Sequence, residues 1–420
     1  MGKLVVLFIL ILTVVAVRSE KARFDNYKVF TVNVESTDQL DVLREIEKSS
    51  SLGYDFWSGP TKVGRAVDIM VPPHKAAEFD EIMTAHQFTT TVKVTNVQEL
   101  IDNEQPKFMP RNVDFGWDRY HTLQEIWDWM DEMVTNNSDV LSHIDAGLSY
   151  EGRPIRGVLL SYKAGNPAVF IESNTHAREW ITSATATYVL NEFINSNDPE
   201  VRHIAEDYDW YIFPNVNPDG FHYSHETNRM WRKTRARIGL LCHGVDPNRN
   251  WGYQWQDGSS AGASNDICSE TYAGPAPFSE PETRQLADYV SQHLPHIKVY
   301  LSYHSYSQLL LYPWSYTSNP APNYDDLYQI GMATADRLKQ SHDITYTVQS
   351  SFDLYISTGT SVDWAYGEAG IQVGYTYEMR DIGFYGFILP ANQIIPNAIE
   401  VLQSMIALLD ESERLGYFQE

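Results

Sequence analysis

The stretch AVFIESNTHAREWIT, residues 168–182, combines a strand pattern, two candidate metal ligands and the start of a helix. Its first part, residues 168–173, has the length and apolar composition of a buried strand, and a helical pattern follows at residues 183–195. Between the two lie His176 and Glu179, spaced so that both side chains can reach one metal ion. A bare His-x-x-Glu match is usually not a metal site, so a third ligand must come from elsewhere in the chain.

The alternation of strand and helix patterns continues through most of the chain after residue 114. We expect strands at residues 155–161, 168–173, 210–214, 297–303 and 371–378. We expect helices at residues 123–134, 183–195, 281–293, 324–341 and 396–413. This pattern is typical of an α/β fold, a mixed and mostly parallel twisted sheet with helices on both faces.

The candidate site residues follow the expected strands. In open α/β sheets, ligands bind beyond the carboxyl ends of the strands. His176, His304 and Glu378 each lie at or just past such an end, so we expect them to form one site. Catalytic zinc takes three protein ligands and keeps a fourth position for water, and His304 is the best candidate for the third ligand.

A smaller α+β unit precedes this domain, at about residues 20–104. We expect its strands at residues 24–34, 66–71 and 89–94, and its helices at residues 40–47 and 75–86. The segment QPKFMPRNVD, residues 105–114, contains two prolines and two basic residues, which suits an exposed connector that proteases cut. Lys107, Arg111 or Arg119 would suit a trypsin-like protease.

The N-terminus predicts secretion. Lys3 is followed by the apolar run LVVLFILILTVVAV, residues 4–17, which is too short to span a membrane. We interpret residues 1–19 as a signal peptide and not as a membrane anchor. In an oxidising compartment the two cysteines, Cys242 and Cys268, are expected to form one disulfide, with two free buried thiols as the alternative. The sequon at Asn136 could carry a glycan.

Composition excludes some partners. The chain has 420 residues with a formal net charge of −24, so it lacks the basic excess that binding to nucleic acid or to an anionic membrane requires. The many aromatic residues, 26 Tyr, 17 Phe and 11 Trp, fit a packed globular protein and not a disordered one.

Many motifs in the order of one family accompany the candidate ligands. They include YHTLQEIWDWMD (120–131), NTHAREWI (174–181), NVNPDGF (215–221), NRMWRKTR (228–235), GVDPNRNW (244–251), YHSYSQLLLYPW (303–314), SVDWAYG (361–367) and YEMRDIGFYGFILP (377–390). With these motifs the chain resembles the zinc carboxypeptidases of the digestive, pancreatic A/B type, and most of all carboxypeptidase A. The resemblance implies a signal peptide at residues 1–19, an activation prosegment at residues 20–111 and a catalytic domain at residues 112–420.

The resemblance implies one zinc ion per chain, held by His176, Glu179 and His304. Asp246 would accept the second ring N–H of His176 and fix its tautomer. Glu378 would be the catalytic carboxylate, which takes a proton from water and delivers it to the leaving amine.

The other matched residues would hold the peptide substrate. Arg232 would polarise the scissile carbonyl. Asn248, Arg249 and Tyr355 would bind the free C-terminal carboxylate, for which a planar guanidinium is suited. A further pair, Arg178 and Tyr306, would line the outer subsites.

The expected side-chain pocket favours apolar C-terminal residues. In basic-specific relatives an acidic residue stands at the position of Val362, and a buried Lys or Arg without a counter-charge is costly. Further apolar walls are expected from Leu311, Leu354 and Thr376. Ser315 and Ser350 make the pocket more polar than that of the apolar-specific relatives, which argues against a strict aromatic preference. We expect release of both aliphatic and aromatic residues.

Several alternatives are open at this point. One is carboxypeptidase B-like specificity for basic residues, and another is an inactive peptide-binding relative, although no expected ligand or base is missing. The unit at residues 20–104 could also be a permanent accessory domain. We expect a secreted monomer whose partners are peptide C-termini and a trypsin-like activating protease.

Overall fold

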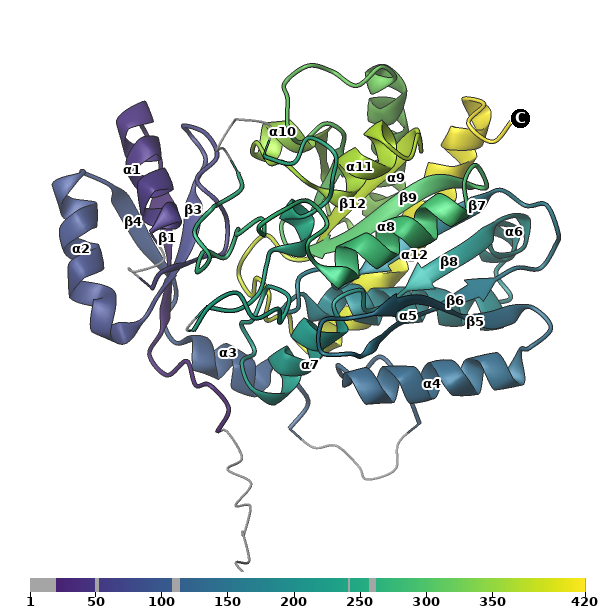
Figure 1. The fold of residues 1–420 in the computed structure, drawn as a ribbon, viewed down its shortest axis with the longest axis horizontal. Coiled ribbons are helices and arrows are strands. Elements are labelled where there is room, and N and C mark those ends of the chain that lie inside the picture. The colour runs from purple at the N-terminus through teal and green to yellow at the C-terminus, as the bar shows by residue number, and fades with distance from the viewer. Residues whose placement is uncertain (1–19, 50–52, 108–113, 241, 257–261, 420) are drawn as a thin grey trace, which may run out of the picture.

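The computed structural model describes residues 20–49, 53–107, 114–240, 242–256 and 262–419. Residues 1–19, the expected signal peptide, and Arg111 of the connector lie outside the described residues. An N-terminal domain, residues 20–104, lies to one side of a large domain that begins after the connector (Figure 1). Among the described residues, none of the helices combines the length and the apolar character that crossing a bilayer requires.

The N-terminal domain has a four-stranded sheet in the order β2-β3-β1-β4, and every neighbouring pair in it is antiparallel. Its elements are β1 (Lys28–Asn33), α1 (Thr37–Lys48), β2 (Asp55–Phe56), β3 (Val67–Val71), α2 (Ala76–Ala85), β4 (Thr89–Val94) and α3 (Val97–Glu104). Apolar residues of the sheet and of the helices, among them Leu43, Ile69 and Phe79, form its core. The α+β expectation is therefore confirmed, while β2 and α3 were not predicted.

The large domain contains an eight-stranded mixed sheet in the order β11-β10-β12-β9-β7-β8-β6-β5. Its strands are β5 (Leu141–Leu148), β6 (Pro154–Leu160), β7 (Ala168–Ser173), β8 (Asp209–Phe213), β9 (Ile297–Ser305), β10 (Leu309–Tyr312), β11 (Thr347–Ser350) and β12 (Val373–Met379). The central strands β12, β9, β7 and β8 are parallel to one another, while β5, β6 and β10 introduce antiparallel pairs. The expected mixed, mostly parallel sheet is confirmed.

Helices cover both faces of this sheet (Figure 1). They are α4 (Leu123–Asn136), α5 (Trp180–Asn195), α6 (Pro199–Asp207), α7 (Pro218–Glu226), α8 (Pro281–Gln292), α9 (Tyr324–His342), α10 (Ser351–Leu354), α11 (Ser361–Gly367) and α12 (Ile394–Arg414). Short 3₁₀ turns occur at Pro73–Lys75, Pro247–Arg249 and Ala391–Gln393.

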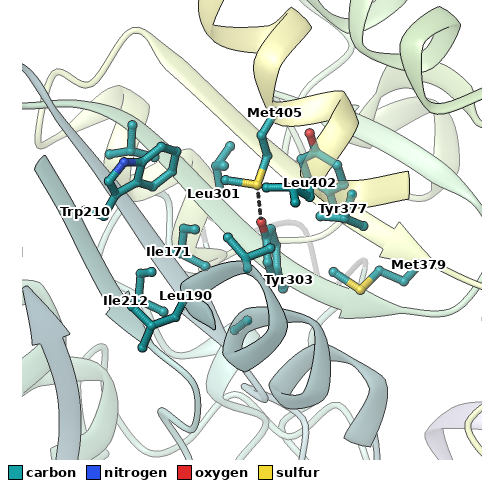
Figure 2. Packing of buried hydrophobic residues seen from close by; sticks show 14 of the residues in the cluster. Ile171, Leu190, Trp210, Ile212, Leu301, Tyr303, Tyr377, Met379, Leu402 and Met405 are labelled. Atoms are coloured by element: carbon teal, nitrogen blue, oxygen red, sulfur yellow. Dashed lines mark hydrogen bonds between the residues drawn. The ribbon is translucent and has the colours of Figure 1, made fainter. Parts of the chain in front are cut away.

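Two layers of core explain why β7 is an unbroken apolar run. Val169 and Ile171 pack into the core on one face, whereas Ala168 and Phe170 pack into the core on the other. Because both faces of this strand are buried, its apolar residues do not alternate with polar ones. Figure 2 shows part of the first core, where the hydroxyl of Tyr303 donates to the sulfur of Met405 at 3.1 Å.

The two cysteines are bonded. Cys242 and Cys268 form a disulfide across 26 positions of sequence, which confirms the expected pairing. The bond joins two parts of the long segment between α7 and α8, in which the described residues form no long helix or strand.

Candidate metal centre and substrate cleft

The site lies where β7, β9 and β12 end. His176 and Glu179 occupy the turn between β7 and α5, and His304 is the penultimate residue of β9. Glu378 on β12 is the direct cross-strand neighbour of His304. Because these strands are parallel, their carboxyl ends meet at one edge of the sheet and bring the four side chains together.

Three of these side chains form a buried cluster. The Nδ1 atom of His176 is 2.8 Å from Oε1 of Glu179 and 3.1 Å from Nδ1 of His304. The same His304 nitrogen is 3.1 Å from Oε2 of Glu179. Each of the three residues is at most 4% exposed. Among the described residues, this is the group of His and carboxylate side chains that could share one metal ion.

Asp246 decides the tautomer of His176. Its Oδ1 lies 3.0 Å from Nε2 of His176, and its Oδ2 accepts from Arg232 at 2.8 Å. Burial would raise the pKa of this carboxyl, but the charges of Arg232 and His176 hold it well below its usual value. Asp246 is therefore an anion, and the Nε2–H group of His176 donates to it.

The orientation of the His176 ring shows whether the three side chains can bind one metal ion. With Nε2 directed at Asp246, Nδ1 of His176 faces the carboxylate of Glu179, where a metal ion can take the place of a proton. Burial would raise the pKa of Glu179, but His176 and His304 lower it below its ordinary value, so the carboxyl is ionised. In tetrahedral zinc sites neighbouring ligand atoms are about 3.3 Å apart, close to the spacings found here. The donor set fits zinc.

Glu378 lies beside this cluster and lines the same cleft, whose volume is about 860 Å³. Burial raises the pKa of its carboxyl to about 8, and the nearby Glu179 raises it too, while His304 and Arg232 act in the opposite direction. A carboxyl group with a pKa in this range can both accept and donate a proton near neutral pH.

The cleft contains a second group of cationic and polar residues. The guanidinium of Arg249 donates to the carbonyl oxygens of Gly262 at 2.5 Å and Asn248 at 2.7 Å, and to the hydroxyl of Tyr355 at 3.1 Å. These contacts hold the guanidinium in one orientation. Arg232 is fixed by Asp246 in the same cleft. The sequence-predicted carboxylate-binding residues are thus brought together.

The predicted outer residues face the N-terminal domain. Arg178 is 1% exposed, and its Nη1 donates to Oδ2 of Asp55 at 2.7 Å. The hydroxyl of Tyr306 lies 3.3 Å from Oδ2 of Asp68. The ring of Trp57 packs edge-on against Tyr306, with centroids 6.5 Å apart.

Further N-terminal groups point into the cleft. Burial raises the pKa of the Glu47 carboxyl to about 7, against the opposing charges of Arg249 and Arg232. Burial lowers the pKa of Arg65, whose charge faces Tyr355 and Glu378. The sequence analysis did not predict a role for Glu47 and Arg65, because the sequence around them does not show which residues of the N-terminal domain face the cleft.

Of the residues expected to form the side-chain pocket, Leu354 lines the cleft, whereas Val362 and Thr376 lie buried beneath the surface. Val362 and Thr376 are 3% and 8% exposed, and neither lines the cleft. Val362 packs over Gly374, where an added Cβ would lie 3.2 Å from its Cγ1. The hydroxyl of Ser315 donates to the buried carboxylate of Asp363 at 3.2 Å. This hydroxyl group therefore binds another residue of the protein and does not face the expected pocket.

Comparison with known families matches both parts of the chain. A family model described as zinc carboxypeptidase matches residues 126–404. A second model, described as carboxypeptidase activation peptide, matches residues 30–104.

Individual zinc carboxypeptidases are similar to this chain in sequence and in structure. Zinc carboxypeptidase A 1 of Anopheles gambiae is 42% identical over 96% of this chain and 93% of its own length. A zinc carboxypeptidase of Simulium vittatum is 51% identical over 71% of this chain and 99% of its own length. The crystal structure of the carboxypeptidase A from Helicoverpa armigera superposes with a TM-score of 0.84 at 27% identity, covering 94% of this chain and 99% of that one.

Proposed function

This chain belongs to the zinc carboxypeptidase family, and we propose that it is the secreted precursor of an enzyme that releases aliphatic and aromatic residues from peptide C-termini. The observation that carries the proposal is the shared cleft. It places a buried His₂Glu cluster and the carboxyl of Glu378 in one cavity with the fixed guanidinium of Arg249. A peptide end can therefore be held by its carboxylate while its last bond lies near the metal.

Zinc is the cofactor of this family, and His176, Glu179 and His304 are the residues that would hold it. When bound, zinc lowers the pKa of a coordinated water and polarises a carbonyl group. Asp246 supports this arrangement, because it keeps the proton of His176 on Nε2 and leaves Nδ1 free to ligate.

Glu378 is the proton carrier in the proposed reaction. It takes a proton from the attacking water and transfers it to the nitrogen of the departing residue. In the precursor, burial raises its pKa to about 8. Removal of the N-terminal domain exposes the carboxyl to water, so the pKa should fall and more of the group should be ionised at neutral pH.

Arg249, Asn248 and Tyr355 bind the chain end. The guanidinium of Arg249 is held by two carbonyl oxygens, so it needs little reorganisation to pair with a carboxylate. The hydroxyl of Tyr355, which follows the last residue of α10, accepts from the same guanidinium at 3.1 Å. Arg232, fixed by Asp246, stabilises negative charge on the former carbonyl oxygen.

The preference for apolar residues rests on Val362. Its side chain lies against the sheet at Gly374, beside the row that Leu311 and Thr376 form across β10 and β12. An incoming Lys or Arg would find no free counter-charge there, since the carboxylate of Asp363 is engaged by the N–H and hydroxyl groups of Ser315.

The N-terminal domain keeps the precursor inactive. It places Asp55 on Arg178 and Asp68 near Tyr306, and the charged side chains of Glu47 and Arg65 face the cleft. A peptide cannot enter while these groups are in place. We propose that a trypsin-like protease cuts the connector at residues 105–114 and so releases the domain, residues 20–111, from the catalytic domain, residues 112–420.

One experiment tests this function. The purified chain is treated with trypsin and then given a panel of peptides that differ only in the last residue, with and without 1,10-phenanthroline. We expect release of C-terminal Phe, Leu and Val after trypsin treatment, little release before it, and none with the chelator. Preferred release of Arg or Lys would refute the proposed specificity, and full activity of the uncut chain would refute the precursor role.

A further inference from the structure

A buried carboxylate lies behind the residues that bind the chain end. Glu172 is the penultimate residue of β7 and is 1% exposed. Its cross-strand neighbour is Ser302 of β9, whose own neighbour on β12 is Thr376. Along β7, Glu172 follows Ala168 and Phe170 on the same face, and those two residues belong to an apolar core.

Two hydroxyl groups bind this carboxylate. Ser302 Oγ donates to Oε1 of Glu172 at 2.6 Å, and Ser361 Oγ donates to the same oxygen at 2.5 Å. The buried hydroxyl of Tyr300 also faces this carboxylate, whose charge adds to burial in raising the pKa of Tyr300. Burying a carboxylate costs free energy that burying an apolar residue would not, even where hydroxyl groups surround it. Packing alone therefore does not account for a glutamate at this position.

Ser361 connects the carboxylate to the cleft. It is the first residue of α11, and its backbone N–H group lies 3.0 Å from the side-chain oxygen of Asn248. A backbone N–H group can only donate, so the atom that it meets is Oδ1 of the amide. The NH₂ end of Asn248, whose side chain borders the cleft beside Arg249, is left as a donor.

We propose that Glu172 is a positioning residue for recognition of the peptide end. It anchors the hydroxyl of Ser361, Ser361 orients the amide of Asn248, and the NH₂ group of that amide donates to the terminal carboxylate. This inference rests on the proposed function, because it assigns the carboxylate-binding role to Asn248 and Arg249. It adds a residue that never contacts the substrate.

The proposal predicts a selective defect. Ser361→Ala keeps the backbone N–H but removes the link to Glu172. In the trypsin-processed enzyme, KM for a peptide with a free C-terminus should rise about tenfold, as expected for one weakened hydrogen bond to a charged group, while kcat changes less than about twofold. Glu172→Leu should act in the same way, and Glu172→Gln, which keeps an acceptor oxygen, should restore most of the affinity. Ser412→Ala is the matched control, because Ser412 is a buried serine in α12.

Inhibitor binding separates positioning from general damage. Benzylsuccinate carries a carboxylate like that of a peptide end, whereas acetohydroxamate binds zinc without one. The Ki of benzylsuccinate should rise about tenfold in Ser361→Ala, with acetohydroxamate unchanged and with wild-type zinc content and melting temperature. Equal weakening of both inhibitors, or of neither, would overturn the proposal.

A double-mutant cycle completes the test. In an Asn248→Ala background, Ser361→Ala should cause no further loss, because the amide that it orients is absent. Additive losses would overturn the relay. If the unmodified processed enzyme released no C-terminal residue, the proposed function itself would fail, and that result is distinct from an active enzyme with an additive cycle.

Discussion

The contact between Asp55 and Arg178 should control how tightly the N-terminal domain closes the cleft. The guanidinium of Arg178 is 1% exposed, its Nη1 meets Asp55 at 2.7 Å, and its plane lies over Phe387 at 4.0 Å. Two further atoms of the pair, Nε of Arg178 and Oδ1 of Asp55, have no hydrogen-bond partner among the described residues. Asp55→Asn would therefore remove the carboxylate that contacts this buried cation directly while the domain stays closed.

The magnitude follows from this burial. Removing one partner of a buried ion pair costs about 3–5 kcal/mol, and asparagine keeps the shape and one acceptor, so about 2–3 kcal/mol is expected here. Since an open domain lets water reach Arg178, the change favours opening by about 30- to 160-fold.

The assay is the activity of the uncut chain on a small peptide substrate, relative to the trypsin-processed enzyme. Asp55→Asn should raise this basal activity by the factor given above, until it reaches that of the processed enzyme. The control is Glu78→Gln, which removes an ion pair within the N-terminal domain, with Lys75 at 2.7 Å. If Asp55→Asn and Glu78→Gln gave the same basal activity as the unmodified chain, the closure argument would be wrong.

Three further predictions concern specificity and stability. Val362→Asp should shift the preferred C-terminal residue toward Lys and Arg, measured as kcat/KM on a peptide panel; an unchanged order would contradict the pocket assignment. Burial raises the pKa of Glu282 to about 8, so the native state keeps a proton that the unfolded chain loses above about pH 4.5, and stability falls as pH rises from there to about 8. Glu282→Gln should remove that loss, so the variant should gain up to about 5 kcal/mol of unfolding free energy over the unmodified protein between pH 4 and pH 9, measured by urea unfolding. Replacing Cys242 and Cys268 with serine should cost about 3–4 kcal/mol, because the bond closes a loop across 26 positions, and an unchanged melting temperature would refute it.

The parts of the fold that the sequence predicts are those with strong local patterns. The apolar run of β7 and the long helices α9 and α12 were expected within a few residues of their observed bounds. The edge strand β5 was missed because its residues, LSHIDAGL, form no unbroken apolar run and half of them are exposed. Helix α6 was also missed, although Asp198 at its N-cap and Pro199 at its first position are readable start signals.

The site residues also fall into two groups, those that the sequence predicts and those that it does not. The metal ligands and Arg249 lie in motifs whose spacing can be read from the chain, and the structure brings them together. Glu172 reads as an ordinary strand residue, and its role depends on a contact with Ser361, 189 positions away. Asp55 lies in the two-residue strand β2, and the residue that it binds, Arg178, belongs to the other domain. Contacts of this kind depend on the tertiary arrangement, so no local pattern predicts them.

The zinc content of the purified chain tests the central claim most directly, since that claim requires residues from two separate strand ends to share one ion. We predict one zinc per unmodified chain by plasma emission spectrometry, and one in Glu378→Gln, whose carboxyl is not a ligand. His304→Ala should retain almost none while its circular dichroism spectrum stays that of a folded protein. A folded His304→Ala variant that still binds one zinc per chain would contradict the account.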